Sequence, residues 1–244
     1  MPFSNVYDDA ARAEAYAGLE FPGTYYLAYR DLPAIIARHV TGRAALDFGC
    51  GTGRSTRFLK NLGFHALGID ISSNMIQLAQ NADPNGAYRL VADGDFNALE
   101  PGRFDLILSA FAFDNIPGAV RRCELLRGLR CLLAEDGRII ILGSTPDIYI
   151  HEWASFTTKA FPENRFAKGG DQVRIVMKDV EDERPVVDIV WFDEDYRKLF
   201  AESGLGLLAR YAPLGREEEP YEWVTETKIA PWVIYVLEKL EASS

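Results

Sequence analysis

The sequence predicts an α/β fold in which a doubly wound, mostly parallel sheet is covered by helices on both faces. Strand-like and helix-like segments alternate from about Arg43 to Gly143, and such alternation requires right-handed crossovers between parallel strands. Residues 104–109 are almost all apolar, as in a strand that is buried on both faces. The length of 244 residues, 48% of them hydrophobic, suits a single domain with a sizeable core.

Five strands and three helices are expected in this first part. The strands are residues 44–48, 65–69, 88–91, 104–109 and 138–142. A helix is expected at 54–62, and a second one after Ser72 and Ser73, whose hydroxyls can cap it. A third is expected at 119–133, where apolar side chains recur at helical spacing: Val120, Cys123, Leu126 and Leu129.

After Gly143 the regular alternation ends. Residues 173–177 and 186–191 have strand patterns, Asp193 is expected to cap a helix over 194–203, and the last strands are expected at 205–211 and 229–237. In a parallel sheet, ligands bind beyond the carboxyl ends of the strands, where the strand order reverses. Here those ends carry four polar residues: Asp47, Asp70, Asp95 and Ser109.

Charge and cysteine content narrow the classes of function. The net charge of −10 argues against a general surface for nucleic acid or anionic membranes, because phosphate binding needs clustered lysine and arginine. Three cysteines, Cys50, Cys123 and Cys131, are too few for a disulfide framework and predict reduced thiols in a cytoplasmic protein. The short apolar stretches and the missing signal-peptide pattern agree with this. No metal-ligand cluster is visible in the sequence.

A glycine-rich loop follows the first strand. Gly49, Gly51 and Gly53 alternate with Cys50 and Thr52, and a helix is expected to begin at Arg54. Glycine lets the backbone pass close to a ligand, and the N–H groups at a helix start point outward. A cofactor with a ribose and a charged tail suits such a loop. A dinucleotide fingerprint would need a third glycine at position 54.

With Asp47 just before it, this loop resembles the first motif of the class I S-adenosylmethionine-dependent methyltransferases. The resemblance covers residues 43–143 well and the C-terminal strands more weakly. It implies a Rossmann-like fold, S-adenosyl-L-methionine as cofactor, and methyl transfer to a small-molecule acceptor by in-line displacement. It also implies an antiparallel pair of last strands at the sheet edge, an N-terminal helical lid over residues 1–42, and an inserted substrate cap over residues 144–192.

The resemblance implies roles for the residues around the loop. Gly49, Cys50, Gly51 and Gly53 would pass under the methionine and ribose parts of the cofactor, with the Cys50 side chain as packing. Asp47 would face the ammonium group of the cofactor.

The ribose and adenine ends follow further along the chain. Asp70 would accept both ribose hydroxyls, and its distance of 70 − 51 = 19 residues from the loop agrees with the ~20 expected for such an acid. Ile71 would lie against the adenine. Asp95, followed by Phe96, would read the adenine amino group, with Asp93 as the alternative.

Two further positions concern the methionine end of the cofactor. Either Ser109 or the Ala110 backbone would lie there. Arg30 would either pair with the cofactor's carboxylate or lie at the protein surface.

Substrate contacts are expected just beyond the fourth strand, at Phe113, Asp114 and Asn115. The segment 114–117 reads Asp-Asn-Ile-Pro, where nitrogen methyltransferases of the family often have Asn/Asp-Pro-Pro-Tyr, and this departure argues against DNA or nucleobase nitrogen as the acceptor. His151 is the candidate general base, with packing as the alternative. Trp153 and neighbouring aromatic residues would line either a substrate pocket or the core of the cap.

Two other functions stay open at this stage. A nicotinamide-dependent reductase would need the missing glycine and a Tyr-x-x-x-Lys pair on a helix, yet that spacing occurs only at Tyr235 and Lys239, in a strand pattern. A non-catalytic S-adenosylmethionine-binding protein is compatible with every motif above. The sequence does not predict the acceptor, the methylated element or the oligomeric state.

Overall fold

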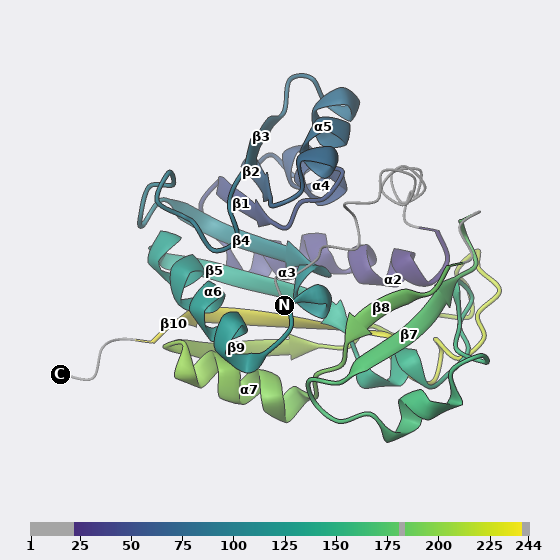
Figure 1. Cartoon of the computed structure of the whole chain (residues 1–244). Coiled ribbons are helices and arrows are strands. Elements are labelled where there is room, and N and C mark those ends of the chain that lie inside the picture. The colour runs from purple at the N-terminus through teal and green to yellow at the C-terminus, as the bar shows by residue number, and fades with distance from the viewer. Residues whose placement is uncertain (1–21, 181–183, 241–244) are drawn as a thin grey trace.

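A computed structural model describes residues 22–180 and 184–240 of the chain. Within them a seven-stranded sheet has the order β3-β2-β1-β4-β5-β10-β9 (Figure 1). The strands are β1 (Ala44–Phe48), β2 (His65–Asp70), β3 (Ala87–Leu90), β4 (Phe104–Ala110), β5 (Leu133–Ser144), β9 (Leu205–Tyr211) and β10 (Trp232–Lys239). β1 to β5 pair in parallel, whereas β10 is antiparallel to both β5 and β9. The predicted Rossmann-like sheet with an antiparallel C-terminal edge is therefore confirmed.

Helices cover both faces of this sheet. They are α2 (Thr24–Arg30), α3 (Leu32–His39), α4 (Arg54–Asn61), α5 (Ser73–Ala82), α6 (Ala119–Leu132) and α7 (Asp193–Glu202). In β4, Leu106 and Leu108 pack into the core that α2, α3 and α4 share, whereas Ile107 packs into the core beneath α6 and α7. This alternation follows from the two-residue period of a strand. It explains why the central strands are apolar at nearly every position.

Three local expectations need correction. Val120 is 75% exposed, because it lies in the first turn of α6 and the buried side of that helix begins with Arg122 and Cys123. Asp193 is the first residue of α7, not its cap: Phe192 holds the cap position, and its N–H donates to the Asp195 carboxylate at 3.0 Å. β5 extends from 133 to 144 because Leu133 already pairs with Phe104 of β4, ahead of a register shift that precedes Arg138.

A second, three-stranded sheet lies between β5 and α7 in the chain. It consists of β6 (Phe156–Thr157), β7 (Gln172–Met177) and β8 (Val186–Ile189), all antiparallel. Two short 3₁₀ helices, η3 (Pro146–Tyr149) and η4 (Pro162–Phe166), flank β6. Its buried side chains join the core shared with α2 and α4, and β8 contacts η2 (Ala112–Asn115), the turn after β4. The small sheet thus lies beside the carboxyl end of β4 (Figure 1).

This arrangement does not test whether residues 1–42 act as a lid or residues 144–192 as a substrate cap. Residues 1–21 of the lid lie outside the described residues, whereas α2 and α3 belong to its remainder. None of the described helices is long and apolar enough to cross a membrane.

Candidate active site

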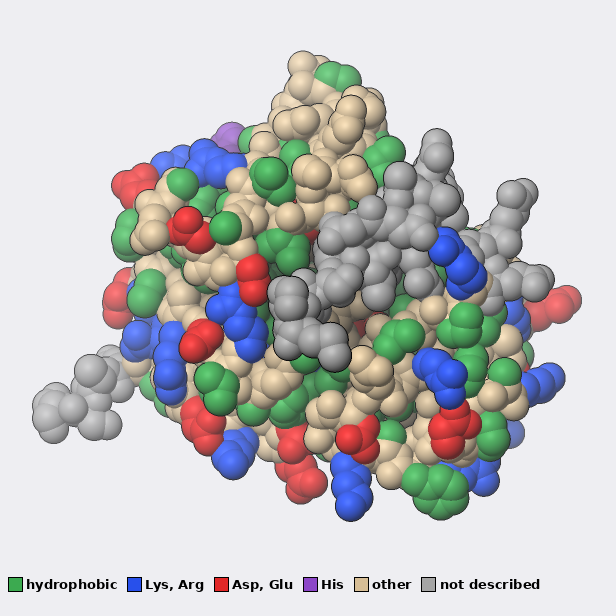
Figure 2. All heavy atoms as spheres, viewed as in Figure 1, with side chains coloured by type: hydrophobic (Ala, Val, Ile, Leu, Met, Phe, Trp, Pro, Cys, Tyr) green, Lys and Arg blue, Asp and Glu red, His purple; other side chains and the backbone are tan. Residues whose placement is uncertain are grey.

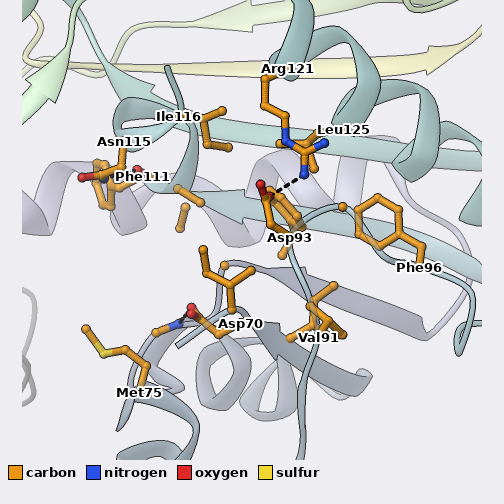
Figure 3. Close-up of a pocket in the computed structure, with 18 of the residues that line it drawn as sticks. Asp70, Met75, Val91, Asp93, Phe96, Phe111, Asn115, Ile116, Arg121 and Leu125 are labelled. Atoms are coloured by element: carbon orange, nitrogen blue, oxygen red, sulfur yellow. Dashed lines mark hydrogen bonds and ion pairs between the residues drawn. The ribbon is translucent and has the colours of Figure 1, made fainter. Parts of the chain in front are cut away.

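A cavity of about 280 Å³ lies at the carboxyl ends of β1, β2 and β4 (Figure 3). Phe48, Asp70 and Ala110 reach it from those three strand ends, and Arg121 reaches it from α6. The strand order reverses between β1 and β4, which is where doubly wound sheets bind their ligands. The predicted location of the site therefore coincides with this cavity.

Gly49 and Gly51 of the glycine loop line the cavity, whereas Gly53 lies outside its lining. Gly49, Gly51 and Gly53 have φ values of 70°, 52° and 78°, in the left-handed region that favours glycine. A Cβ at position 49 would lie 2.5 Å from the Cβ of Ala112, whereas a Cβ at position 51 would meet only the Met75 sulfur, at 4.0 Å. The loop is thus closely packed behind Gly49 and open in front of Gly51, so a ligand can approach its backbone.

The Asp70 carboxylate is fixed at the edge of this loop. One oxygen accepts a hydrogen bond from the Gly51 N–H and the other from the Ser72 N–H, both at 2.9 Å. Ser72 also caps α5, since its hydroxyl accepts from the Met75 N–H at 3.4 Å. A carboxylate offers about four lone-pair sites, and Asp70 lines the cavity. This geometry suits a ribose diol.

The opposite end of the cavity is apolar and carries one ion pair. Phe96, Val91 and Ile71 line it, and Figure 3 shows Phe96 at the end remote from Phe111. Such a surface suits a flat nucleobase.

The acid at this end differs from the predicted one. Asp93 lines the cavity and pairs with Arg121 at 2.6 Å, whereas the Asp95 carboxylate accepts from the Asn97 N–H at 3.0 Å and is outside the lining. The turn at Gly94, with φ 71°, separates the two acids. Of the two alternatives, the structure therefore favours Asp93.

Three predicted cofactor residues lie beneath the cavity instead of in its lining. Asp47 is fully buried and accepts hydroxyl hydrogen bonds from Ser55 at 2.7 Å and Thr56 at 2.6 Å. Burial raises the pKa of Asp47 to about 6. The Cys50 thiol is buried, and burial together with the nearby Asp47 and Asp70 charges raises its pKa well above the usual value, so it suits packing better than nucleophilic chemistry. Ser109 is also fully buried, and it is the adjacent Ala110 that lines the cavity.

Arg30 is committed to other contacts. Its guanidinium pairs with Glu219 at 2.6 Å and Asp31 at 2.8 Å, and it is outside the lining of the cavity. Its side chain is 11% exposed, so the structure shows neither a place in the cavity lining nor the exposed surface position given as the alternative. Arg54, which sequence reasoning used only as a missing glycine, begins α4 directly after the loop, and its guanidinium lies 5.5 Å from the centre of the Tyr25 ring.

A second cavity, of about 50 Å³, adjoins the first and shares Phe111 and Asn115 with it. Asp114 lines it, and one Asp114 oxygen accepts from the Ser144 N–H at 3.0 Å and from the Ser144 hydroxyl at 2.8 Å. Burial raises the pKa of Asp114 to about 6, although the Arg122 charge opposes the shift. In the same cavity, the Tyr149 hydroxyl donates to Asp188 at 3.1 Å.

Three predicted substrate or catalytic residues lie outside both cavities. The His151 side chain is 37% exposed, and its ring nitrogen lies 3.9 Å from the Asp147 carboxylate. Trp153 is fully buried and donates its indole N–H to the Ile148 carbonyl at 2.8 Å, so it belongs to the core of the small sheet. Phe113 is buried in the other core, under β1 and α6. Asp114 and Asn115 are thus the predicted substrate residues that face a cavity.

Comparison with known proteins agrees with this geometry. Residues 46–141 match a family model described as a methyltransferase domain. The chain is 27% identical over 192 residues to the N-demethylindolmycin N-methyltransferase of Streptomyces griseus, covering 78% of this chain and 80% of that protein. The matched domain holds the glycine loop, Asp70 and Asp114.

Residues 46–141 thus form a methyltransferase domain, and the chain is similar to S-adenosylmethionine-dependent methyltransferases of class I. The fold agrees, since an S-adenosylmethionine-dependent methyltransferase from Clostridium acetobutylicum superposes with a TM-score of 0.62, at 15% identity over 98% of this chain and all of that one. The domain is also shared with an 18S rRNA (guanine-N(7))-methyltransferase of Bos taurus, 30% identical over 99 residues, or 40% of this chain and 35% of that protein. This methyltransferase is therefore an enzyme that uses S-adenosylmethionine, and not a nicotinamide-dependent reductase.

Proposed function

We propose that this methyltransferase transfers the methyl group to a small-molecule acceptor that enters the second cavity. The observation that carries the proposal is the shared wall: Phe111 and Asn115 line both cavities. A methyl group can pass by in-line displacement only between groups that are held next to each other. The relative from Streptomyces griseus is named for a small-molecule acceptor, N-demethylindolmycin, which supports the same class of acceptor here.

The residues of the first cavity fit S-adenosylmethionine. Asp70 would accept the ribose hydroxyls, Ile71 and Phe96 would flank the adenine, and Asp93 would accept from its amino group. When bound, S-adenosylmethionine supplies a methyl group on a sulfonium that is already an activated leaving group. The protein's contribution is then mainly positioning, which can be worth roughly 7–11 kcal/mol of the barrier.

The charge distribution favours a small acceptor over RNA. The net charge is −10, and Figure 2 shows acidic and basic side chains mixed over the face it presents, without a basic stripe among the described residues there. RNA and DNA binding depends on clustered lysine and arginine.

We also propose that the three-stranded sheet serves as the substrate cap and α2 as part of the lid. Tyr25 of α2, Phe156 of β6 and Asp188 of β8 all line the second cavity, which supports this division of the chain. Cys50, Cys123 and Cys131 are free, which fits the cytoplasmic location that the sequence predicts.

The test of the cofactor site is isothermal titration with S-adenosylmethionine and S-adenosylhomocysteine. We expect micromolar affinity for both and, in Asp70→Ala, affinity that is weaker by about 10–100-fold, because hydrogen bonds to a charged acceptor are lost. Asp136→Ala, an exposed aspartate near the other end of β5, is the matched control and should bind normally. An absence of heat with both nucleosides, or unaltered affinity in Asp70→Ala, would contradict the assignment.

A further inference from the structure

The second cavity presents acceptors of hydrogen bonds to whatever enters it. Asp114 and Asp188 contribute carboxylates, and both are buried, at 5% and 9% exposure. Among its described lining residues there is no lysine, arginine or histidine. Buried carboxylates are costly unless a positive charge or hydrogen-bond donors stabilise them. For Asp114, which accepts hydrogen bonds from Ser144 and forms no ion pair among the described residues, a ligand that brings both is therefore the best match.

Asn115 adds an acceptor that is independent of the acids. Its side-chain N–H donates to the Phe111 carbonyl at 3.3 Å, which fixes the orientation of the amide. Its Oδ1 is buried and has no hydrogen-bond partner among the described residues. Asn115 lines both cavities, so its side chain belongs to their common wall, and a buried acceptor of this kind calls for a donor.

The guanidinium of Arg122 does not form a hydrogen bond with Asp114. Its guanidinium donates to the carbonyls of Phe113 and Ile116 and to the Tyr196 hydroxyl, not to the Asp114 carboxylate. Ser144 donates both of its hydrogen bonds to the same Asp114 oxygen, Oδ2. A donor group on the ligand can therefore hydrogen-bond to the Asp114 carboxylate without displacing an ion pair.

Aromatic rings complete the wall. The centre of the Tyr25 ring lies 5.1 Å from that of Phe156 and 5.8 Å from that of Phe111, and both pairs meet edge-on. All three residues line the cavity. Phe111 holds a left-handed backbone, with φ 63°, which is strained for a residue with a side chain. Such strain is retained where function requires a side chain in a particular place, and aromatic rings attract cations.

We propose that the acceptor is a small primary or secondary amine, whose nitrogen binds in the second cavity between the Asp114 carboxylate and the Asn115 side-chain oxygen. This rests on the proposed function. For transfer, the bound ammonium gives one proton to the Asp114 carboxylate, and its freed lone pair bonds to the methyl carbon. The methyl–sulfur bond breaks, and its electron pair stays on sulfur.

The test compares benzylamine with benzyl alcohol, which has the same ring and no positive charge. Each is titrated into the full-length protein saturated with S-adenosylhomocysteine. We expect benzylamine to bind at least about tenfold more tightly than the alcohol, and Asp114→Asn to abolish this preference. Asparagine keeps an oxygen for the Ser144 hydrogen bonds, so the variant removes charge with little change of shape.

Controls separate this proposal from the proposed function. S-adenosylhomocysteine affinity is measured first, in the parent protein and in every variant. A parent protein that does not bind S-adenosylhomocysteine would overturn the proposed function. A variant that binds it as the parent does has an intact first cavity. Asp136→Asn should keep the amine preference. Asp188→Asn is the second variant, should Asp114→Asn fail to fold, and it should weaken the preference as well. Equal affinity for the two probes, or no binding of benzylamine by the loaded parent protein, would overturn the amine assignment.

Discussion

The two adjoining cavities of this methyltransferase are built in different ways. The first draws on residues 48–125, mostly from turns that directly follow a strand. The second gathers α2, the turn after β4, the end of β5 and all three strands of the small sheet, from Tyr25 to Asp188. The first is therefore encoded by short motifs, and the second exists only once distant segments have packed together.

Their chemistry differs in the same sense. The cofactor cavity offers backbone, an acid and flat apolar walls, which suit a ligand that many methyltransferases share. The second offers buried carboxylates and aromatic rings. The turn that carries Phe111 and Asn115 belongs to both, so it is the part of the molecule on which transfer depends.

The largest expected effect tests what holds this shared turn. Arg122 is fully buried and donates to the carbonyls of Phe113 and Ile116. Arg122→Met would leave these acceptors unsatisfied, at a cost of about 3 kcal/mol. We expect Tm to fall by about 6–12 °C in a chain of this size. Differential scanning calorimetry measures this, and Arg127→Met, an exposed position on the same helix, should lower Tm by less than about 2 °C. Equal shifts in the two variants would mean that the turn is held by other contacts.

An intermediate effect distinguishes the buried acid beneath the cofactor cavity. Burial raises the pKa of Asp47 to about 6 from 3.8, so between about pH 4 and 6 the folded state binds more protons than the unfolded state. The contribution of Asp47 to stability therefore rises as pH falls through this range. Urea unfolding at pH 7 and pH 5 measures the free energy of unfolding of the parent and of Asp47→Asn. The parent's value relative to that of the variant should be higher at pH 5 than at pH 7, on the order of 1–2 kcal/mol. A difference that is independent of pH would show that Asp47 is not desolvated.

The smallest expected effect concerns the histidine that sequence reasoning proposed as a base. His151 lines neither cavity and is partly exposed. His151→Ala should therefore change benzylamine affinity by less than about twofold and stability by less than about 0.5 kcal/mol. The same titration as for Asp114→Asn measures it. A loss of benzylamine affinity comparable to that in Asp114→Asn would indicate that the acceptor binds near His151 instead.

Sequence patterns were informative where neighbours in the chain are also neighbours in space. The left-handed glycines at 49, 51 and 53 and the acid at 70 lie within one strand-turn-helix unit or at the end of the adjacent strand. The sequence left Asp93 as an alternative to Asp95, because which of the two acids lines the cavity depends on the direction of one turn, at Gly94. Arg30 was assigned by its chemistry, yet its ion pair with Glu219 joins residues far apart in the chain.

The sequence alone determined the class of fold and the cofactor, and it predicted the rim at which the first cavity lies, because strand periodicity, glycine spacing and strand-end acids are local properties of the chain. Tertiary structure alone decided which acid faces the cofactor cavity, that Trp153 is a core residue, and that Asp114, Asn115 and Asp188 meet beside an aromatic wall. The physical reason is that burial and cavity lining depend on the packing of segments more than 100 residues apart, as with Tyr25 and Phe156. No pattern within either segment records that contact.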